Sequence, residues 1–207
     1  MKIVKPKLSK YMEELVLYEE STYEDLVDIV ITDQDIDFKI EGIEFNGCKF
    51  VNVDFSSFPL KRVDLIDCVF ERCNLSGCDF SDRAIHRVCF DRCNLVGCDF
   101  IGSSLSDISI IDSKCNYINF SDSTIKNLLI KDSILKEGRI VNTKLCNIEF
   151  DNVDFSMVEF LNTKLGGLDF SNCNINDIGV SVNDIRGVTV NSEQALMLIS
   201  LLGIVVK

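Results

Sequence analysis

The cysteines are the residues of this chain best suited to chemistry, because a thiolate can act as a nucleophile, a metal ligand or a disulfide partner. The chain has ten of them in 207 residues, and none are spaced as Cys-x-x-Cys, the usual signature of a zinc site. Seven instead recur at a spacing divisible by five: Cys48, Cys68, Cys73, Cys78, Cys93, Cys98 and Cys173.

A reduced cysteine packs as a small hydrophobic residue. We therefore interpret these seven, together with Cys115, as core residues rather than metal ligands or a disulfide framework. Cys89 and Cys146 fall outside the inward positions and are expected to be the exposed thiols. A thiol-rich redox or metal protein remains the alternative.

The single histidine, His86, lies between Arg83 and Arg87 with no cysteine or serine beside it in a nucleophile motif. The chain also lacks a glycine-rich phosphate-binding loop. We therefore predict no enzyme, no cofactor, no metal site and no small-molecule substrate.

The cysteines and the histidine lie in a sequence pattern that repeats every five residues. From Ile40 to Val190 every fifth residue is apolar, without an insertion or deletion. This period is neither the 3.6 of a helix nor the 2.0 of a strand. It predicts a chain that turns a corner every five residues, which is a solenoid of stacked coils.

The other positions of the unit support corners. Two residues before each apolar centre the side chain is usually small or apolar, and two residues after it the residue is usually Gly, Asn or Asp. Those three types tolerate positive φ. The segment CNLSGCDF at residues 73–80 recurs as CNLVGCDF at 93–100, and this offset of twenty predicts four sides per coil. The 31 five-residue units make about 7.75 coils, and at about 4.8 Å per coil these form a rod roughly 37 Å long.

This unit resembles that of the pentapeptide-repeat proteins over about three quarters of the chain. The resemblance implies an all-β solenoid, a right-handed quadrilateral β-helix. The segment from Asp184 to Val188, followed by residues 194–197 and 202–204, is similar to the C-terminal end of the Qnr quinolone-resistance group and its Gram-positive relatives.

The sequence departs from both patterns. Many Qnr proteins carry loops that interrupt the coils, whereas no interruption occurs here between residues 40 and 190. This weakens what the Qnr resemblance implies about function. Arg83, Gly138 and Asn183 occupy inward positions that should be apolar. They mark either local distortions or contacts with a partner.

The chain divides into an N-terminal cap (1–35), the repeat β-helix (36–190) and a C-terminal helix with its tail (191–207). The cap is expected to contain a helix near residues 10–15 and a strand near 26–31. In the last segment Asn191 or Ser192 can cap a helix that stops at Gly203.

The C-terminal helix is apolar on most sides, so it must be buried on most sides. The end of a coil can cover only one side, and a two-fold partner is the simplest source of the second cover. We therefore predict a homodimer through six residues: Ala195, Met197, Leu198, Leu201, Leu202 and Ile204. The alternative is a capping helix whose additional apolar residues are exposed.

The net charge limits the kinds of partner that the protein can bind. The net charge of −12 disfavours nucleic acid. No apolar run is long enough to span a membrane and no signal peptide is visible, so we expect a cytoplasmic protein with no membrane partner.

Carboxylates gather between residues 149 and 184, where Lys164 is the only basic residue. Five of them, which we call the acidic section, form the candidate partner-binding surface: Glu149, Asp154, Glu159, Asp169 and Asp184. The Qnr resemblance implies a rod that mimics DNA and binds bacterial DNA gyrase or topoisomerase IV. Two alternatives remain: a general protein-interaction scaffold, and a composition that is acidic only because Asp suits the repeat.

Overall fold

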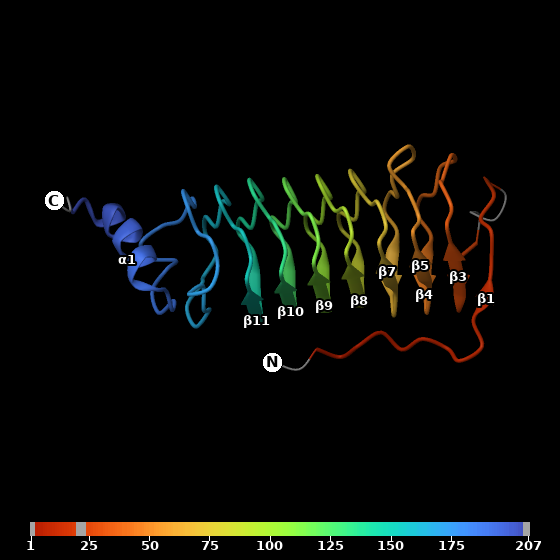
Figure 1. Cartoon of the computed structure of the whole chain (residues 1–207), viewed down its shortest axis with the longest axis horizontal. Coiled ribbons are helices and arrows are strands. Elements are labelled where there is room, and N and C mark those ends of the chain that lie inside the picture. Colours follow the sequence, from red (N-terminus) through yellow and green to blue (C-terminus); the bar gives the residue numbers. More distant parts are fainter. Residues whose placement is uncertain (1–2, 20–23, 205–207) are drawn as a thin grey trace.

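The computed structural model describes residues 3–19 and 24–204 and shows a rod of stacked coils with one helix at its C-terminal end (Figure 1). Its elements are β1 (Glu13–Glu14), β2 (Leu26–Val27), β3 (Ile29–Thr32), β4 (Glu44–Asn46), β5 (Lys49–Val51), β6 (Asp64–Ile66), β7 (Val69–Glu71), β8 (Ala84–Asp91), β9 (Ser104–Ile111), β10 (Thr124–Lys131), β11 (Lys144–Asp151) and α1 (Ser192–Ile199), which continues as a 3-10 turn over Ser200–Leu202.

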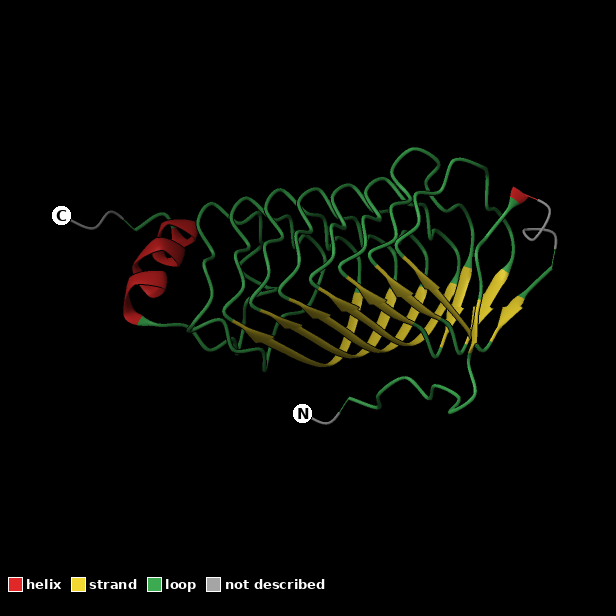
Figure 2. Cartoon of the chain, turned by 45° about the vertical axis from the view of Figure 1, so that its right-hand side comes forward, coloured by secondary structure: helices red, strands yellow, loops and turns green. Residues whose placement is uncertain are grey.

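The predicted quadrilateral solenoid is confirmed by the register of its strands. Ile85 pairs with Leu105, Leu105 with Ile125 and Ile125 with Leu145, always in parallel and always twenty residues apart. The strands occupy adjoining sides of the rod, and the remaining sides are turns joined by isolated bridges (Figure 2). Each residue therefore lies directly above the residue one coil earlier, and the side chains form columns along the rod.

The core consists of these columns. Phenylalanines of successive coils stack with ring centroids 4.6 Å apart for Phe50 and Phe70, and 5.0 Å apart for Phe80 and Phe100. Nearly all of the five-residue centres are buried. The unbroken five-residue period predicts that every centre is buried, and this is wrong at Leu145, Ile185 and Val190, which are half-buried.

The exceptions have a physical cause. Ile185 and Val190 lie in the last coil, with no further coil above them. Leu145 lies in β11, the last strand of the sheet, and lines a groove with Gly166 and Gly167. Those two glycines supply no side chain to cover it.

The corners adopt the predicted left-handed conformation, and they do so whatever residue is present. Gly77 and Asn142 have positive φ, but so do Arg72, Tyr117 and Met157. A side chain in this conformation costs about 1–2 kcal/mol. The corner N–H donates to a carbonyl of the next coil, as Arg72 does to Asp91 at 2.9 Å, so the stack imposes the geometry.

The inward positions hold hydroxyls as well as thiols, which the sequence analysis did not identify. Ser103 and Thr163 are buried, and their hydroxyls donate to the carbonyls of Phe80 (2.6 Å) and Ile140 (2.7 Å). Cys98 makes the equivalent contact, with its sulfur 3.0 Å from the carbonyl of Leu75. A thiol and a hydroxyl are therefore interchangeable here, because both bond a carbonyl twenty-three residues earlier.

The rod accommodates the three irregular positions in different ways. The side chain of Arg83 leaves the core and lies 3.5 Å from the carboxylate of Asp64, and Asn183 is exposed. At Gly138 a Cβ would lie 3.0 Å from the carbonyl oxygen of Leu135, so a side chain would be crowded there.

The N-terminal region continues the stack. The helix expected near residues 10–15 is wrong, because Glu13 and Glu14 form β1 and pair with β3. The strand expected near 26–31 is present as β2 and β3. Pairing with an exposed strand edge outweighs the local helix preference here.

Residues 3–11, which we call the strap, leave this end and run back along the outside of the rod (Figures 1 and 2). No helix in the described part of the chain is long and apolar enough to cross a membrane.

Candidate functional site

The acidic section surrounds the rod rather than forming one patch. Glu149 lies in β11 on one side, and Asp169 follows it by twenty residues. Asp154 pairs with Ile134 on the next side, and Glu159 pairs with Arg139 on the side after that. The structure brings together only Glu149 and Asp169 in one column, and Asp184 lies in the last coil.

Several of these carboxylates face cations. Lys136 lies 3.1 Å from Asp154, and Arg139 lies 3.1 Å from Glu159. The local negative field is therefore weaker than the number of acidic residues indicates.

The aspartates also have a structural role in the repeat. Asp154 and Asp169 accept hydrogen bonds from the N–H groups of Ser156 (3.0 Å) and Ser171 (2.8 Å), two residues further on. Burial raises the pKa of Asp154, but its bonds to Ser156 outweigh burial and the pKa is lowered. The pKa of Asp169 is lowered by hydrogen bonds from Ser171. Both carboxylates are therefore ionised at neutral pH.

The helix α1 is anchored by a polar residue. Asn191 caps it by accepting from the N–H of Gln194 at 3.0 Å. Gln194 is buried at 3% exposure, and its side-chain amide donates to the carbonyls of Phe170 (2.8 Å) and Cys173 (2.7 Å). This contact holds the helix against the last coil.

The predicted dimer interface divides between rod and solvent. Leu198 packs against the core of the rod. Five of the six residues are exposed: Ala195, Met197, Leu201, Leu202 and Ile204. Leu196, which is not among the six, is also exposed, at 55%. Residues of α1 and the last coil line a groove of about 530 Å³.

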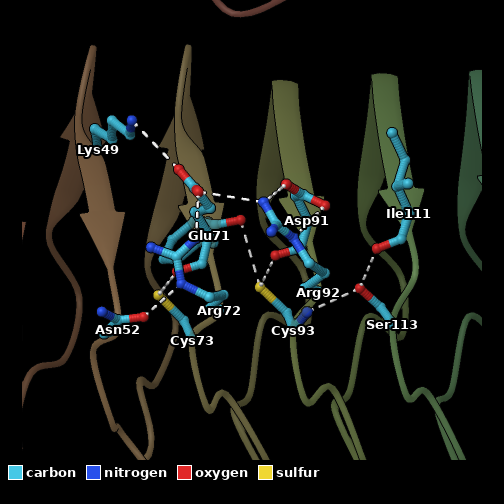
Figure 3. A network of polar contacts seen from close by, with 11 residues as sticks. Lys49, Asn52, Glu71, Arg72, Cys73, Asp91, Arg92, Cys93, Ile111 and Ser113 are labelled. Carbon is cyan, nitrogen blue, oxygen red and sulfur yellow. Dashed lines mark hydrogen bonds and ion pairs between the residues drawn. The ribbon is translucent and has the colours of Figure 1, made fainter.

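An ionic network that the sequence analysis missed ties together coils of the N-terminal half (Figure 3). Glu71 is 2.5 Å from Arg72, 3.2 Å from Arg92 and 3.4 Å from Lys49. Hydrogen bonding to Arg72 is the main reason that the pKa of Glu71 is lowered. The spacing of twenty between Arg72 and Arg92 was the signal that could have revealed it.

The cysteines are all free, and eight are buried. Cys146 is exposed as predicted, whereas the prediction for Cys89 is wrong because that thiol is half-buried. Within residues 3–19 and 24–204, no group of His, Cys, Asp and Glu side chains is arranged to hold a metal ion.

A rod of square coils with five-residue sides defines the class of protein. Family models match it in sequence: one described as eight copies of the pentapeptide repeat at residues 43–82, and one described as a pentapeptide repeat region at 63–140. The chain is a pentapeptide-repeat protein. None of the curated protein sequences matches it.

Two solved structures are similar to this chain, and that of HetL shows the same fold. HetL, a pentapeptide-repeat protein involved in heterocyst differentiation regulation in the cyanobacterium Nostoc, is 11% identical with a TM-score of 0.52, over 82% of this chain and 91% of HetL. QnrB1, a plasmid-mediated fluoroquinolone resistance protein, is 23% identical with a TM-score of 0.47, over 89% of this chain and 99% of QnrB1. At these identities the similarity concerns the fold and not the function.

Proposed function

We propose that this protein is a non-enzymatic, cytoplasmic acidic rod that binds a bacterial type II topoisomerase, DNA gyrase or topoisomerase IV, in the manner of a DNA mimic. The observation that supports the proposal most is the fixed spacing of ionised carboxylates near the C-terminal end of a rigid rod. The DNA-binding surface of such an enzyme is positively charged, so these carboxylates attract it, and a rod that is already ordered loses little entropy on binding.

A homodimer through α1 would extend this surface. A two-fold axis at the C-terminal end places two copies of the acidic section on either side of it. The exposed apolar side chains of α1 support this arrangement, because contact with a second copy would remove them from water.

The test uses Glu149 and Asp169, which share a column. The variant Glu149→Lys/Asp169→Lys reverses two charges at positions where the repeat already accepts lysine, as at Lys144 and Lys164. We expect it to weaken binding to purified gyrase at least tenfold, since attraction becomes repulsion. Raising the salt concentration should weaken the complex of the unmodified protein.

The matched control is Asp79→Lys/Asp99→Lys, a pair in the same position of the repeat, one coil apart and far from α1. It should bind gyrase almost as the unmodified protein does. If the unmodified protein neither binds gyrase at low salt nor changes its supercoiling rate, the proposal fails.

A second candidate is a general protein-interaction scaffold. The hydrogen bonds that Asp154 and Asp169 accept from the N–H groups of their own turns favour it, because they explain these aspartates without a partner. Under this alternative, both double variants would leave gyrase supercoiling unchanged.

A further inference from the structure

The strap lies along one corner of the rod and is held there by two of its backbone amides. The N–H of Val4 donates to the carboxylate of Asp107 at 3.1 Å, and the N–H of Lys7 donates to that of Asp67 at 2.8 Å. Asp67 and Asp107 are two coils apart, about 9.6 Å at 4.8 Å per coil. Three residues of extended chain span about the same distance. The strap therefore crosses the strands as an extended peptide in register with the coils (Figure 1).

The corner that receives the strap also has hydrogen bonds between its own side chains, and we call its four residues the corner track: Asp67, Arg87, Asp107 and Asn127. Arg87 holds Asp67 through two bonds of 2.5 Å, and the side-chain amide of Asn127 donates to Asp107 at 3.0 Å. With the strap in place, Asp67 and Asp107 are each only 7% exposed. The Oδ1 of Asp67 accepts from both Arg87 and the strap, and the Oδ1 of Asp107 accepts from both Asn127 and the strap.

The charges of the strap and the corner track are complementary. The corner track carries two carboxylates and one guanidinium, whereas the strap carries Lys5, Lys7 and Lys10. The charge of Lys7 helps to lower the pKa of Asp67, although burial by itself would raise it. The contacts recognise backbone N–H groups and positive charge, and they do not depend on the identity of the other side chains.

We propose that the corner track is a binding site for an extended, lysine-rich polypeptide segment of a partner protein, and that the strap occupies it in competition with that partner. Two surface hydrogen bonds hold a segment that loses conformational freedom when it docks, so the strap exchanges between docked and released states. Its tether gives it a high effective concentration, which makes it an intramolecular inhibitor. The site lies on coils other than those of the acidic section and is independent of the proposed function.

The experiment releases the strap without altering the rod. Proline has no N–H, so the full-length variant Val4→Pro/Lys7→Pro loses both donors. Lys5→Pro is the matched control for Lys7→Pro, because it also removes one lysine and adds one proline beside Pro6. The N–H of Lys5 is not one of the two that hold the strap. The probe is a fluorescein-labelled peptide with the sequence of residues 1–12.

We expect the peptide to bind the released variant at least tenfold more tightly than the unmodified chain or Lys5→Pro, as measured by fluorescence anisotropy. Adding Asp107→Gly to the released variant should abolish the gain. Asp112→Gly should not, since Asp112 is an exposed corner residue with the same positive φ. Glycine already occurs in the column of Asp107, at Gly47 and Gly167, and so adds no backbone strain.

Cys89 reports release independently of the peptide. Lys5 lies close enough to influence the pKa of this half-buried thiol, which burial raises. The charge of Lys5 lowers this pKa and release removes that charge, so the alkylation rate of Cys89 relative to that of Cys146 should change in the released variant. Equal peptide binding by the unmodified chain and the released variant would overturn the proposal. So would an absence of peptide binding by a released variant in which the alkylation rate of Cys89 has changed. An unchanged rate at Cys89 would also overturn it.

Discussion

Several inward positions hold a small thiol or hydroxyl that bonds the carbonyl twenty-three residues earlier, as the sulfur of Cys68 does with Phe45 at 3.3 Å. Burial raises the pKa of the Cys78 thiol to about 12 and also raises that of Cys98. These thiols are therefore protonated as well as inaccessible.

Alkylation should distinguish the thiols. At pH 8 we expect N-ethylmaleimide to modify Cys146 first and Cys89 slowly, because only the thiolate reacts. The eight buried cysteines should react only after denaturation, and mass spectrometry of timed samples measures this. Modification of a buried cysteine as fast as Cys146 would show that the coils open there.

Asp67 should make stability depend on pH. Burial raises its pKa, but hydrogen bonds from Arg87 and from the N–H of Lys7 outweigh burial and lower it from 3.8. A lowered pKa stabilises the fold at pH values above that of the unfolded state, and the contribution is lost as the pH falls through the folded value. We expect Asp67→Asn to cost about 1–3 kcal/mol at pH 7.

The urea midpoints of the unmodified protein and of Asp67→Asn should differ by the same amount at pH 7 and pH 5. They should converge as the pH falls towards 3. The control Asp112→Asn changes an exposed aspartate at another corner and should shift the midpoint little. A gap for Asp67→Asn that stays constant down to pH 3 would contradict the role assigned to this carboxylate.

At the scale of elements, α1 depends on one buried amide more than on its apolar residues. Gln194→Ala removes the donors to the carbonyls of Phe170 and Cys173. The carbonyl of Phe170 keeps its bond from the N–H of Cys173, whereas that of Cys173 loses the donor from Gln194. We expect a loss of about 1–3 kcal/mol in docking of the helix. Amide hydrogen exchange should accelerate over residues 192–202 and remain unchanged in β8 to β10.

The control for this prediction is Glu193→Gln, which changes an exposed residue of the first turn and costs only a few tenths of a kcal/mol. Exchange that accelerates equally in both variants would show that Gln194 is not the anchor.

At the scale of the whole molecule, the rod ends in an apolar surface. If α1 forms the two-fold interface, Met197→Asp places a carboxylate in it and should weaken the dimer at least tenfold, about 1.4 kcal/mol. The rod should remain folded, because Met197 is 41% exposed and its side chain is not part of the core. Analytical ultracentrifugation measures the change.

Met197→Leu keeps the interface apolar and should leave the dimer intact. Leu198→Asp is a poorer test than the sequence pattern indicates, since Leu198 packs on the rod and its replacement would also undock the helix. An unmodified chain that is monomeric at micromolar concentration would refute the predicted interface.

The sequence by itself determined the repeating features of the rod. Five-residue sides, coils of twenty residues, the phenylalanine columns and the corner conformations all follow from the same local pattern, because every coil has the same neighbours above and below. The N-cap at Asn191 and the stop at Gly203 were also predictable, since each depends on a few adjacent residues.

Only the tertiary structure decided the features that do not repeat. These include the ion pair of Lys136 with Asp154, the buried amide of Gln194 and the path of the strap to Asp107. Their partners are distant in the sequence or depend on side-chain rotamers, and no period indicates them. The physical reason is that stacking fixes where each Cα lies, whereas charges, caps and chain ends are placed by contacts that occur once.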